Sequence, residues 1–498
     1  MKIIQKIANH TSQYFVGEVL ILAASFISFP IFTRILSLAE YGAMNIVSMT
    51  IDLFVLFSNA GLRPALFRFF GHYEQDSKEK ANQLFITLFF ATVILALFSI
   101  CILNLICWLP IEAWIAADLL QLMRFSAFLI LFRTASELIL ALFRIKEQAT
   151  FFLIGHVARK YAGLVLAIYF VVVAEQRLEG LFRGLLIGEG TVFLGLVGYI
   201  LFSYRQQFFQ FSGKIFMDCA RYGVPLIGQN FSAFINSVGD RYLIEFMKGS
   251  VAVGIYSTGY NLARYIQALI VDTLEAAMIP LTMNVFAKSG KEETQKLLSI
   301  YFSVYVLIAM PLVWGLFAVA KSAVVIVASD KYLPSVEFVG PLIVGIMVAG
   351  AFFPATVGLH IQKKTTTIAK IMFYTAMLNV LLNLFMIPLW GIWGAVIATI
   401  ISCLFQIVYG LLKSGKYLKV AHNVKFYFVC LISAVLMYFV LRVFNIETQP
   451  SIWGLIGKII VGVLAYVAAV FGFDFLILRK ARMFSRENLA MLTSNKDE

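Results

Sequence analysis

The chain has 498 residues, of which 61% are hydrophobic and only 13% are charged. A soluble protein of this length carries about a quarter of charged residues, so the composition excludes a fold surrounded by water. The net charge is +13, but the basic residues fall in short clusters between apolar runs, which indicates membrane orientation and disfavours a nucleic-acid-binding groove. The sequence therefore predicts an all-α polytopic membrane protein.

Apolar segments long enough to cross about 30 Å of hydrocarbon recur along the chain, and we expect about fourteen transmembrane helices. A short amphipathic segment at residues 1–13 precedes them and is expected to lie on the cytoplasmic face. The segment at 252–286 is longer than one span, and we expect it to bend or to protrude. The expected spans lie at about 14–36, 42–62, 83–109, 118–142, 150–173, 180–203, 224–247, 252–286, 297–320, 336–360, 366–388, 391–412, 424–444 and 453–478.

Basic residues test this arrangement because they accumulate on the cytoplasmic side of a membrane. Loops that are cytoplasmic in the fourteen-span arrangement hold about four times as many of them as the opposite loops. The bias alternates along the whole chain, and one missing or extra span would invert it downstream. We therefore expect both termini to be cytoplasmic, with a basic tail at 479–498.

The five cysteines contain no C-x-x-C pair. Four of them, Cys101, Cys107, Cys403 and Cys430, lie in apolar runs, and Cys219 is expected in a loop. We interpret all five as inert thiols, and we expect no metal and no cofactor.

Two pairs of short motifs share one spacing and indicate an internal repeat. Residues 40–42 and 252–254 open the second and eighth spans, and residues 180–182 and 391–393 open the sixth and twelfth, each pair about 212 residues apart. Parallel repeats of this kind place a transporter's substrate site between the two halves. We expect an N-lobe of helices 1–6 (14–203), a cytoplasmic linker (204–223), a C-lobe of helices 7–12 (224–412), and helices 13–14 (413–478).

Three stretches resemble the polysaccharide biosynthesis flippases, a family within the superfamily that also holds multidrug exporters and the lipid II flippase. They are residues 29–36 (FPIFTRIL) with 40–42 (EYG); residues 223–227 (GVPLI), 240–242 (DRY) and 253–256 (VGIY); and residues 388–399 (PLWGIWGAVIAT). The resemblance covers nearly the whole chain in the right order. It implies two six-helix lobes around a central cavity, two further helices, and transfer of polyprenyl-diphosphate-linked oligosaccharide to the outer leaflet of a bacterial inner membrane.

Ionisable side chains within spans are costly, by about 2.5–3.5 kcal/mol each on insertion scales, and are therefore functional candidates. Arginine suits a lipid diphosphate because its guanidinium stays protonated and binds phosphate oxygens with two parallel hydrogen bonds. The candidate diphosphate ligands are Arg34, Arg63, Arg241 and Arg264. The candidate cavity-lining residues are Arg124, Arg133, Arg159, Lys160 and Asp240. Snorkelling to an interface and structural ion pairing are the alternatives for each of them; Arg133 and Glu137 are four residues apart and could pair locally.

Uphill transport needs a coupling ion or the membrane potential, and an intramembrane carboxylate that binds H⁺ or Na⁺ is the usual means. The candidates are Glu18, Asp52, Asp272 and Glu275, and no spacing favours one of them.

The leading hypothesis is therefore a flippase of the O-antigen or exopolysaccharide type that works by alternating access. Two alternatives remain open: a cation-coupled multidrug exporter, which would favour a cavity rich in carboxylates, and a membrane-embedded glycan polymerase or ligase. An enzyme of that kind usually needs a large outer loop or an acidic site at the membrane edge, and neither is present in the sequence. We therefore expect a transporter that is not an enzyme, with a lipid-linked glycan and membrane lipid as partners, in contact with polysaccharide polymerase or glycosyltransferases.

Overall fold

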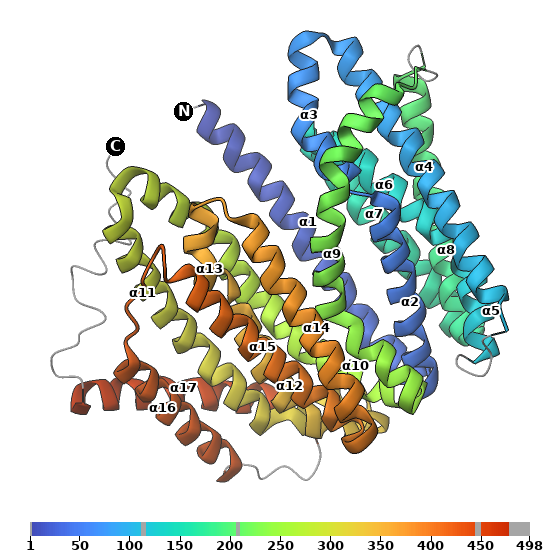
Figure 1. Ribbon diagram of the computed structural model, residues 1–498. Helices are drawn as coiled ribbons and strands as arrows, with labels where there is room; N and C mark the ends of the chain where they lie inside the picture. The colour runs from blue at the N-terminus through green and yellow to red at the C-terminus, as the bar shows by residue number, and fades with distance from the viewer. Residues whose placement is uncertain (1, 111–115, 206–209, 444–449, 478–498) are drawn as a thin grey trace. The chain divides into compact units, whose positions relative to one another are not determined.

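The computed structural model describes residues 2–110, 116–205, 210–443 and 450–477, with side chains from residue 16 to residue 473 except that of Glu18. Every regular element in these ranges is a helix (Figure 1). The elements are α1 (Lys2–Ile35), α2 (Leu38–Asn59), α3 (Leu62–Asp76), α4 (Lys78–Trp108), α5 (Ala117–Ser126), α6 (Phe128–Ile145), α7 (Ala149–Ile168), η1 (Tyr169–Val173), α8 (Arg177–Ser203), α9 (Gly213–Lys248), α10 (Ser250–Gln267), η2 (Ala268–Asp272), α11 (Thr273–Val327), η3 (Asp330–Ser335), α12 (Val336–Gly350), α13 (Phe352–Ile361), α14 (Thr365–Trp390), α15 (Ile392–Ser414), α16 (Val424–Val443) and α17 (Ile452–Ile477).

The prediction of an all-helical membrane protein is confirmed. Eleven helices of the described residues are long and apolar enough to cross a membrane, and Val19–Ile35 forms a shorter apolar helix. One of the eleven, Ser250–Val327, is a continuous stretch that contains two of the expected spans, divided at Gly290, where φ is 78°. The polar helix α9 is not among the eleven. The count of about fourteen spans therefore stays a prediction.

The chain divides into two compact units. The first comprises Met1–Ser257 and Met372–Ala395, and the second comprises Thr258–Ile371 and Val396–Glu498. These boundaries differ from the expected lobe boundaries, so the division into six, six and two helices also stays a prediction. The basic tail at 479–498 and the side chains of residues 2–15 lie outside the described part of the chain.

In the first unit, α7 and α8 form an antiparallel pair with an unusually close backbone approach. Gly184 and Gly188 lie one turn apart on α8, and a Cβ atom at either would overlap the α7 backbone, at Ala167 and Ala162 respectively. Small residues four apart allow this approach between membrane helices, which otherwise gain no hydrophobic energy from association. The contact fixes α8 against α7, and α6 packs on the same pair.

Two glycine contacts join the two ends of α2 to α9 and α10, also within the first unit. At one end, a Cβ at Gly42 would overlap the backbone of Ser250, and one at Gly254 would overlap Leu38. At the other end, Gly61 has a φ of 70°, and the backbones of Gly61 and Gly223 are in direct contact. Because no side chain intervenes, α2 lies directly on the backbone of these two helices at both ends.

Cys219 corrects one sequence-based expectation. The helix α9 begins at Gly213, capped by Ser212, whose Oγ accepts a hydrogen bond from the N–H of Ile215 at 3.4 Å. Cys219 is therefore inside a helix and 1% exposed, where the sequence predicted a loop. The apolar pattern marks where the chain enters the membrane, and this helix starts well before that point. Burial raises the pKa of the Cys219 thiol to about 11, as expected for an unreactive cysteine.

In the second unit, α16 and α17 form a pair that packs on α11 (Figure 1). Met437 of α16 and Tyr466 of α17 belong to one buried cluster, and the hydroxyl of Tyr466 donates a hydrogen bond of 2.9 Å to the carbonyl of Leu307. At the end of α15, the hydroxyl of Ser414 accepts a hydrogen bond of 3.0 Å from the backbone N–H of Gly358 in α13.

Candidate functional site

The first unit contains a cluster of charged side chains contributed by four apolar helices. Asp52 lies in α2, Arg133 in α6, Arg159 and Lys160 in α7, and Glu189 in α8. Each belongs to a helix long and apolar enough to span a membrane. Charge in that environment is expensive unless it is paired or faces a water-filled cavity. The packing of α6 on the α7–α8 pair and of α2 on α6 brings these charges together.

Arg133 is the centre of the cluster. Its Nε donates to both carboxylate oxygens of Glu189, at 3.3 and 3.0 Å, and its second terminal nitrogen donates to Oε1 of Glu189 at 2.9 Å. The other terminal nitrogen donates to Oδ1 of Asp52 at 2.9 Å. One guanidinium therefore bridges α2 and α8 through two carboxylates, an arrangement that uses the planar fork of arginine.

The two carboxylates differ sharply in exposure. The Glu189 side chain is 9% exposed and the Arg133 side chain 18%, whereas the Asp52 side chain is 55% exposed. Gly163 of α7 faces Glu189: a Cβ at that glycine would lie 3.3 Å from Cγ of Glu189. Glu189 is thus the enclosed structural partner of Arg133, and Asp52 is the partner that remains accessible.

The expected local pairing of Arg133 with Glu137 is wrong. Glu137 instead accepts hydrogen bonds from Arg63 at 3.4 Å and from Nδ2 of Asn59 at 3.2 Å. Residues four apart share a helix face, but here Arg133 binds the carboxylates of Glu189 and Asp52, which lie on other helices. Arg63, a candidate diphosphate ligand that lies at the start of α3, is therefore joined to α6 and half-exposed.

Two further cations on α7 leave the cluster with an excess of positive charge. Arg159 donates to the backbone carbonyl of Arg133 at 3.4 Å. Lys160 is exposed and interacts electrostatically with Glu189 and Asp52. Three cations thus face two carboxylates, which leaves the cluster with one positive charge in excess. The arrangement can attract an anion.

Of the candidate diphosphate ligands, Arg241 is enclosed in the first unit. It is 2% exposed, and its guanidinium donates to the carbonyl of Ser237 at 2.8 Å and lies 5.8 Å from the centre of the Tyr256 ring. Asp240 accepts hydrogen bonds from the Tyr256 hydroxyl and from the backbone N–H of Arg241. This pair packs α9 against α10, so a ligand role would require it to be uncovered.

In the second unit, the candidates Arg264, Asp272 and Glu275 lie around the π-helical turn η2. Arg264 forms an ion pair of 3.0 Å with Asp272, and the two side chains are 45% and 40% exposed. Glu275 is half-buried one turn further along. The π-helical turn changes the direction of residues that follow it, which accords with the expected bend in the long 252–286 segment.

Two of the remaining predicted residues, Arg34 and Arg124, belong to helices that contribute nothing to the central cluster. Arg34 is exposed in the last turn of α1. Arg124 is exposed on α5 and donates to the carbonyl of Cys107. The side chain of Glu18 lies outside the described residues.

Sequence reasoning missed two carboxylates as site residues, Glu189 and Glu137. Both are visible in the sequence as intramembrane charges. Their partners come from other helices, at separations of 56 residues for Arg133–Glu189 and 74 for Arg63–Glu137. No local spacing rule connects residues so far apart.

Comparison with solved structures places this architecture among known transporters. The chain is similar to the lipid II flippase MurJ in an inward closed conformation, with 14% sequence identity and a TM-score of 0.74 over 95% of this chain and 100% of that one. It is also similar to a multidrug resistance transporter of the MATE family and MOP superfamily in an inward-facing conformation, with 14% identity and a TM-score of 0.60 over 80% of this chain and 94% of that one. At this level of identity the likeness establishes the fold.

Curated protein sequences give no match to the chain. A family model described as polysaccharide biosynthesis protein matches residues 31–337, well over half of the sequence. The matched range includes α2, α6, α7 and α8, which carry the charged cluster. The chain therefore belongs to the polysaccharide biosynthesis protein family, with the fold of the MurJ and MATE transporters.

Proposed function

We propose that the protein is a flippase that moves a polyprenyl-diphosphate-linked oligosaccharide, the repeat unit of an O-antigen or exopolysaccharide, from the inner to the outer leaflet by alternating access. The observation that carries the proposal is the cation excess around Arg133, on helices long and apolar enough to span a membrane. Arg133, Arg159 and Lys160 carry three positive charges against the two negative charges of Glu189 and Asp52, so one positive charge is left for an anion.

A diphosphate carries negative charge that must pass a region where an unpaired ion is very costly. Lys160 offers a compact charge on a flexible stem, and Arg159 offers a fork that binds phosphate oxygens. Arg159 and Lys160 are adjacent on α7 and both interact with the Arg133 cluster, so we propose that they act on one diphosphate. Further positive charges that could bind the diphosphate head group would come from Arg34, Arg63 and Arg264. Arg241 would contribute only after a change in packing exposes its buried side chain.

For coupling, we propose that Asp52 binds H⁺ or Na⁺. Its side chain is 55% exposed and shares Arg133 with the enclosed Glu189, so it can exchange an ion without breaking the Arg133–Glu189 contacts. Protonation of Asp52 would release one of the bonds that hold α2 to α6. Asp272 and Glu275 stay as alternative coupling sites in the second unit. The coupling ion is identified by measuring translocation after collapse of the proton gradient and, separately, of the sodium gradient.

The direct test is outward exposure of lipid-linked oligosaccharide in spheroplasts or proteoliposomes that contain the full chain. We expect Arg159→Gln and Lys160→Gln to slow translocation at least tenfold with normal expression and insertion. Lys248→Gln, which removes an exposed lysine at the end of α9, is the matched control. Normal translocation by both α7 variants would refute the assigned role of the cluster.

The runner-up function is a cation-coupled multidrug exporter, and the accessible Asp52 is the observation that favours it. Such a protein would export cationic dyes, and Asp52→Asn would abolish that export. Dye accumulation in cells that express the protein separates the two functions, because a flippase leaves accumulation unchanged. A glycan polymerase or ligase, the enzymatic alternative, would change the length of the glycan when incubated with the lipid-linked substrate.

The same proposal assigns the protein to a bacterial inner membrane with both termini cytoplasmic, in contact with the polymerase or glycosyltransferases of its pathway. Accessibility of single cysteines to a membrane-impermeant reagent tests the orientation. A cysteine that replaces Lys291 should react only after permeabilisation, whereas one that replaces Lys331 should react in intact spheroplasts.

A further inference from the structure

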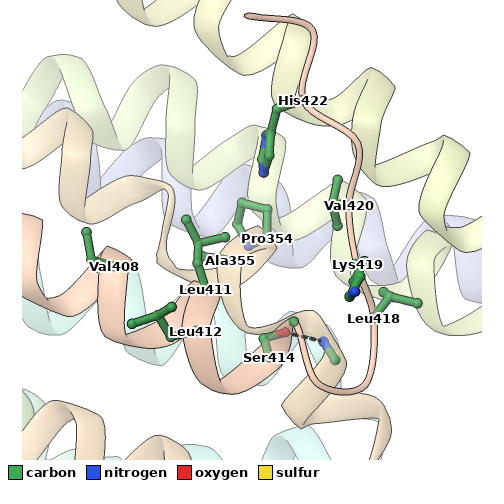
Figure 2. A pocket seen from close by; sticks show the side chains of 12 residues that line it. Pro354, Ala355, Val408, Leu411, Leu412, Ser414, Leu418, Lys419, Val420 and His422 are labelled. Carbon is green, nitrogen blue, oxygen red and sulfur yellow. Dashed lines mark hydrogen bonds between the residues drawn. The ribbon is translucent and has the colours of Figure 1, made fainter.

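A pocket of about 470 Å³ lies in the second unit where α15 ends, and none of its lining residues belongs to the charged cluster. Figure 2 shows its walls: Leu411 and Leu412 of α15 on one side, Pro354 of α13 at the back, and the segment 415–423 on the other side. His422 points toward the pocket from that segment (Figure 2). Its volume is in the range of sites that enclose small organic ligands, about 300–1,000 Å³.

The α15 wall of the pocket is apolar and continues onto an exposed helix face. Val408 is 54% exposed and Leu412 66% exposed. Both lie in a helix long and apolar enough to span the membrane, within its last two turns. Side chains of this kind at the end of a membrane helix contact the part of a lipid chain nearest its head group.

The opposite rim is cationic. Lys419 lines the pocket and is exposed. Lys416 is exposed on the same segment three residues earlier, outside the lining, and Lys364 has its Nζ 5.1 Å from the centre of the neighbouring Tyr417 ring. The sequence has no Asp or Glu between Glu337 and Glu447, so the residues that line the pocket contribute only positive charge. Glu292 and Glu293 lie on α11 close to Gln295, and Glu293 is paired with Lys296 at 2.7 Å.

The segment that forms this rim is held in place by contacts within the second unit. The Ser414 hydroxyl accepts the Gly358 N–H at 3.0 Å, and Gln295 of α11 donates to the carbonyl of Lys419 at 2.6 Å. The His422 ring packs edge-on against Phe302 at 4.9 Å. These contacts leave the pocket preformed, which reduces the entropy cost of filling it.

We propose that this pocket is a binding site for an anionic glycerophospholipid, with one acyl chain against the α15 wall, the phosphate at Lys419 and His422, and Lys416 adding positive charge on the same segment. An apolar wall joined to a cationic rim at the end of a membrane helix matches both parts of such a lipid. A soluble anion would use the rim alone, and a zwitterionic lipid would gain little from it. None of the residues that line the pocket has a part in the proposed transport, so this inference does not depend on the transport substrate.

The test is native mass spectrometry of the full-length protein, released from micelles that contain phosphatidylglycerol or phosphatidylcholine. We expect retention of one phosphatidylglycerol with clear preference over phosphatidylcholine. Each lysine near a lipid surface contributes about fivefold to anionic lipid binding, so Lys416→Gln with Lys419→Gln should weaken retention by about 25-fold. The matched control removes two exposed lysines of α11, Lys288→Gln with Lys291→Gln, and should leave retention unchanged.

A second pair of variants tests the apolar wall without touching charge. Val408→Ala with Leu412→Ala should shorten the lifetime of the bound lipid. Ile401→Ala with Leu404→Ala, two turns earlier on the same helix, should leave that lifetime unchanged. Equal retention of the two lipids, or equal loss in both lysine pairs, would overturn the proposal. Displacement of the lipid by millimolar inorganic phosphate would show that the rim binds a free anion, and displacement by a polyprenyl phosphate would assign the pocket to the transport substrate; either result refutes the phospholipid assignment.

Discussion

The unequal exposure of Glu189 and Asp52 leads to a sharp prediction about Arg133. Replacing Glu189 by Gln removes the charge of a 9% exposed carboxylate that accepts three donor contacts, and it leaves a largely enclosed guanidinium with one ionic partner. Breaking a buried ion pair from one side costs about 3–5 kcal/mol of unfolding free energy. Asp52→Asn removes a single contact to a half-exposed carboxylate and should cost about 1 kcal/mol or less.

The measurement is the free energy of unfolding of purified protein in mixed micelles, titrated with a denaturing detergent. A double variant, Arg133→Met with Glu189→Met, replaces the pair by apolar side chains of similar volume and should recover most of the loss, because no charge stays enclosed. Equal destabilisation by Glu189→Gln and Asp52→Asn would refute the distinction between an enclosed and an accessible partner. Failure of the double variant to recover stability would refute the ion-pair origin of the effect.

Three further outcomes follow from other parts of the structure. Gly42→Val should prevent the close contact between α2 and α10 and lower the yield of monodisperse protein in size-exclusion chromatography, whereas Gly71→Val, with open space around the glycine, should not. Burial lowers the pKa of Lys146, so the unfolded chain binds more protons than the folded one between that lowered pKa and about 10.4; stability should rise with pH across this window, and Lys146→Met should reduce the rise seen in unfolding titrations. Arg264→Gln breaks a half-exposed ion pair with Asp272 and should change the unfolding free energy by less than about 1 kcal/mol while it reduces glycan-lipid translocation at least tenfold; normal translocation would exclude Arg264 as a ligand.

Much of the fold could be predicted from the sequence because hydrophobic length and basic loops are local signals. Each expected span coincides with helix in the described residues. The family model confirms the resemblance over residues 31–337, which is shorter than the expected coverage of nearly the whole chain and leaves the stretch 388–399 outside the match. The start of α9 was harder to predict from the sequence, because a helix can continue into water without leaving an apolar pattern. The kink at Gly290 likewise depends on one positive φ value, which no composition window detects.

The charged cluster was only half predictable. The sequence identifies Asp52, Arg133, Arg159 and Lys160 as costly intramembrane charges because each interrupts an apolar run. Which charges meet depends on helix packing, and that packing depends on backbone contacts such as the one between Gly188 and Ala162. A glycine in a membrane helix is too common to reveal its partner, so the Arg133–Glu189 pair required the three-dimensional structure.

The two glycine contacts at the ends of α2 have a mechanical consequence. Residues 42 and 59 lie about 25 Å apart along this helix, so a tilt of about 10° about one contact would displace the other by about 4 Å. Separation at the Gly42 end breaks backbone packing, and separation at the Gly61 end also parts the rings of Phe57 and Phe231, whose centres lie 5.6 Å apart. Helix α2 can therefore tilt so that one end separates from its neighbouring helix while the other end stays in contact. Asp52, whose carboxylate is accessible, lies between the two ends, so a change in its charge can alter the tilt of the whole helix.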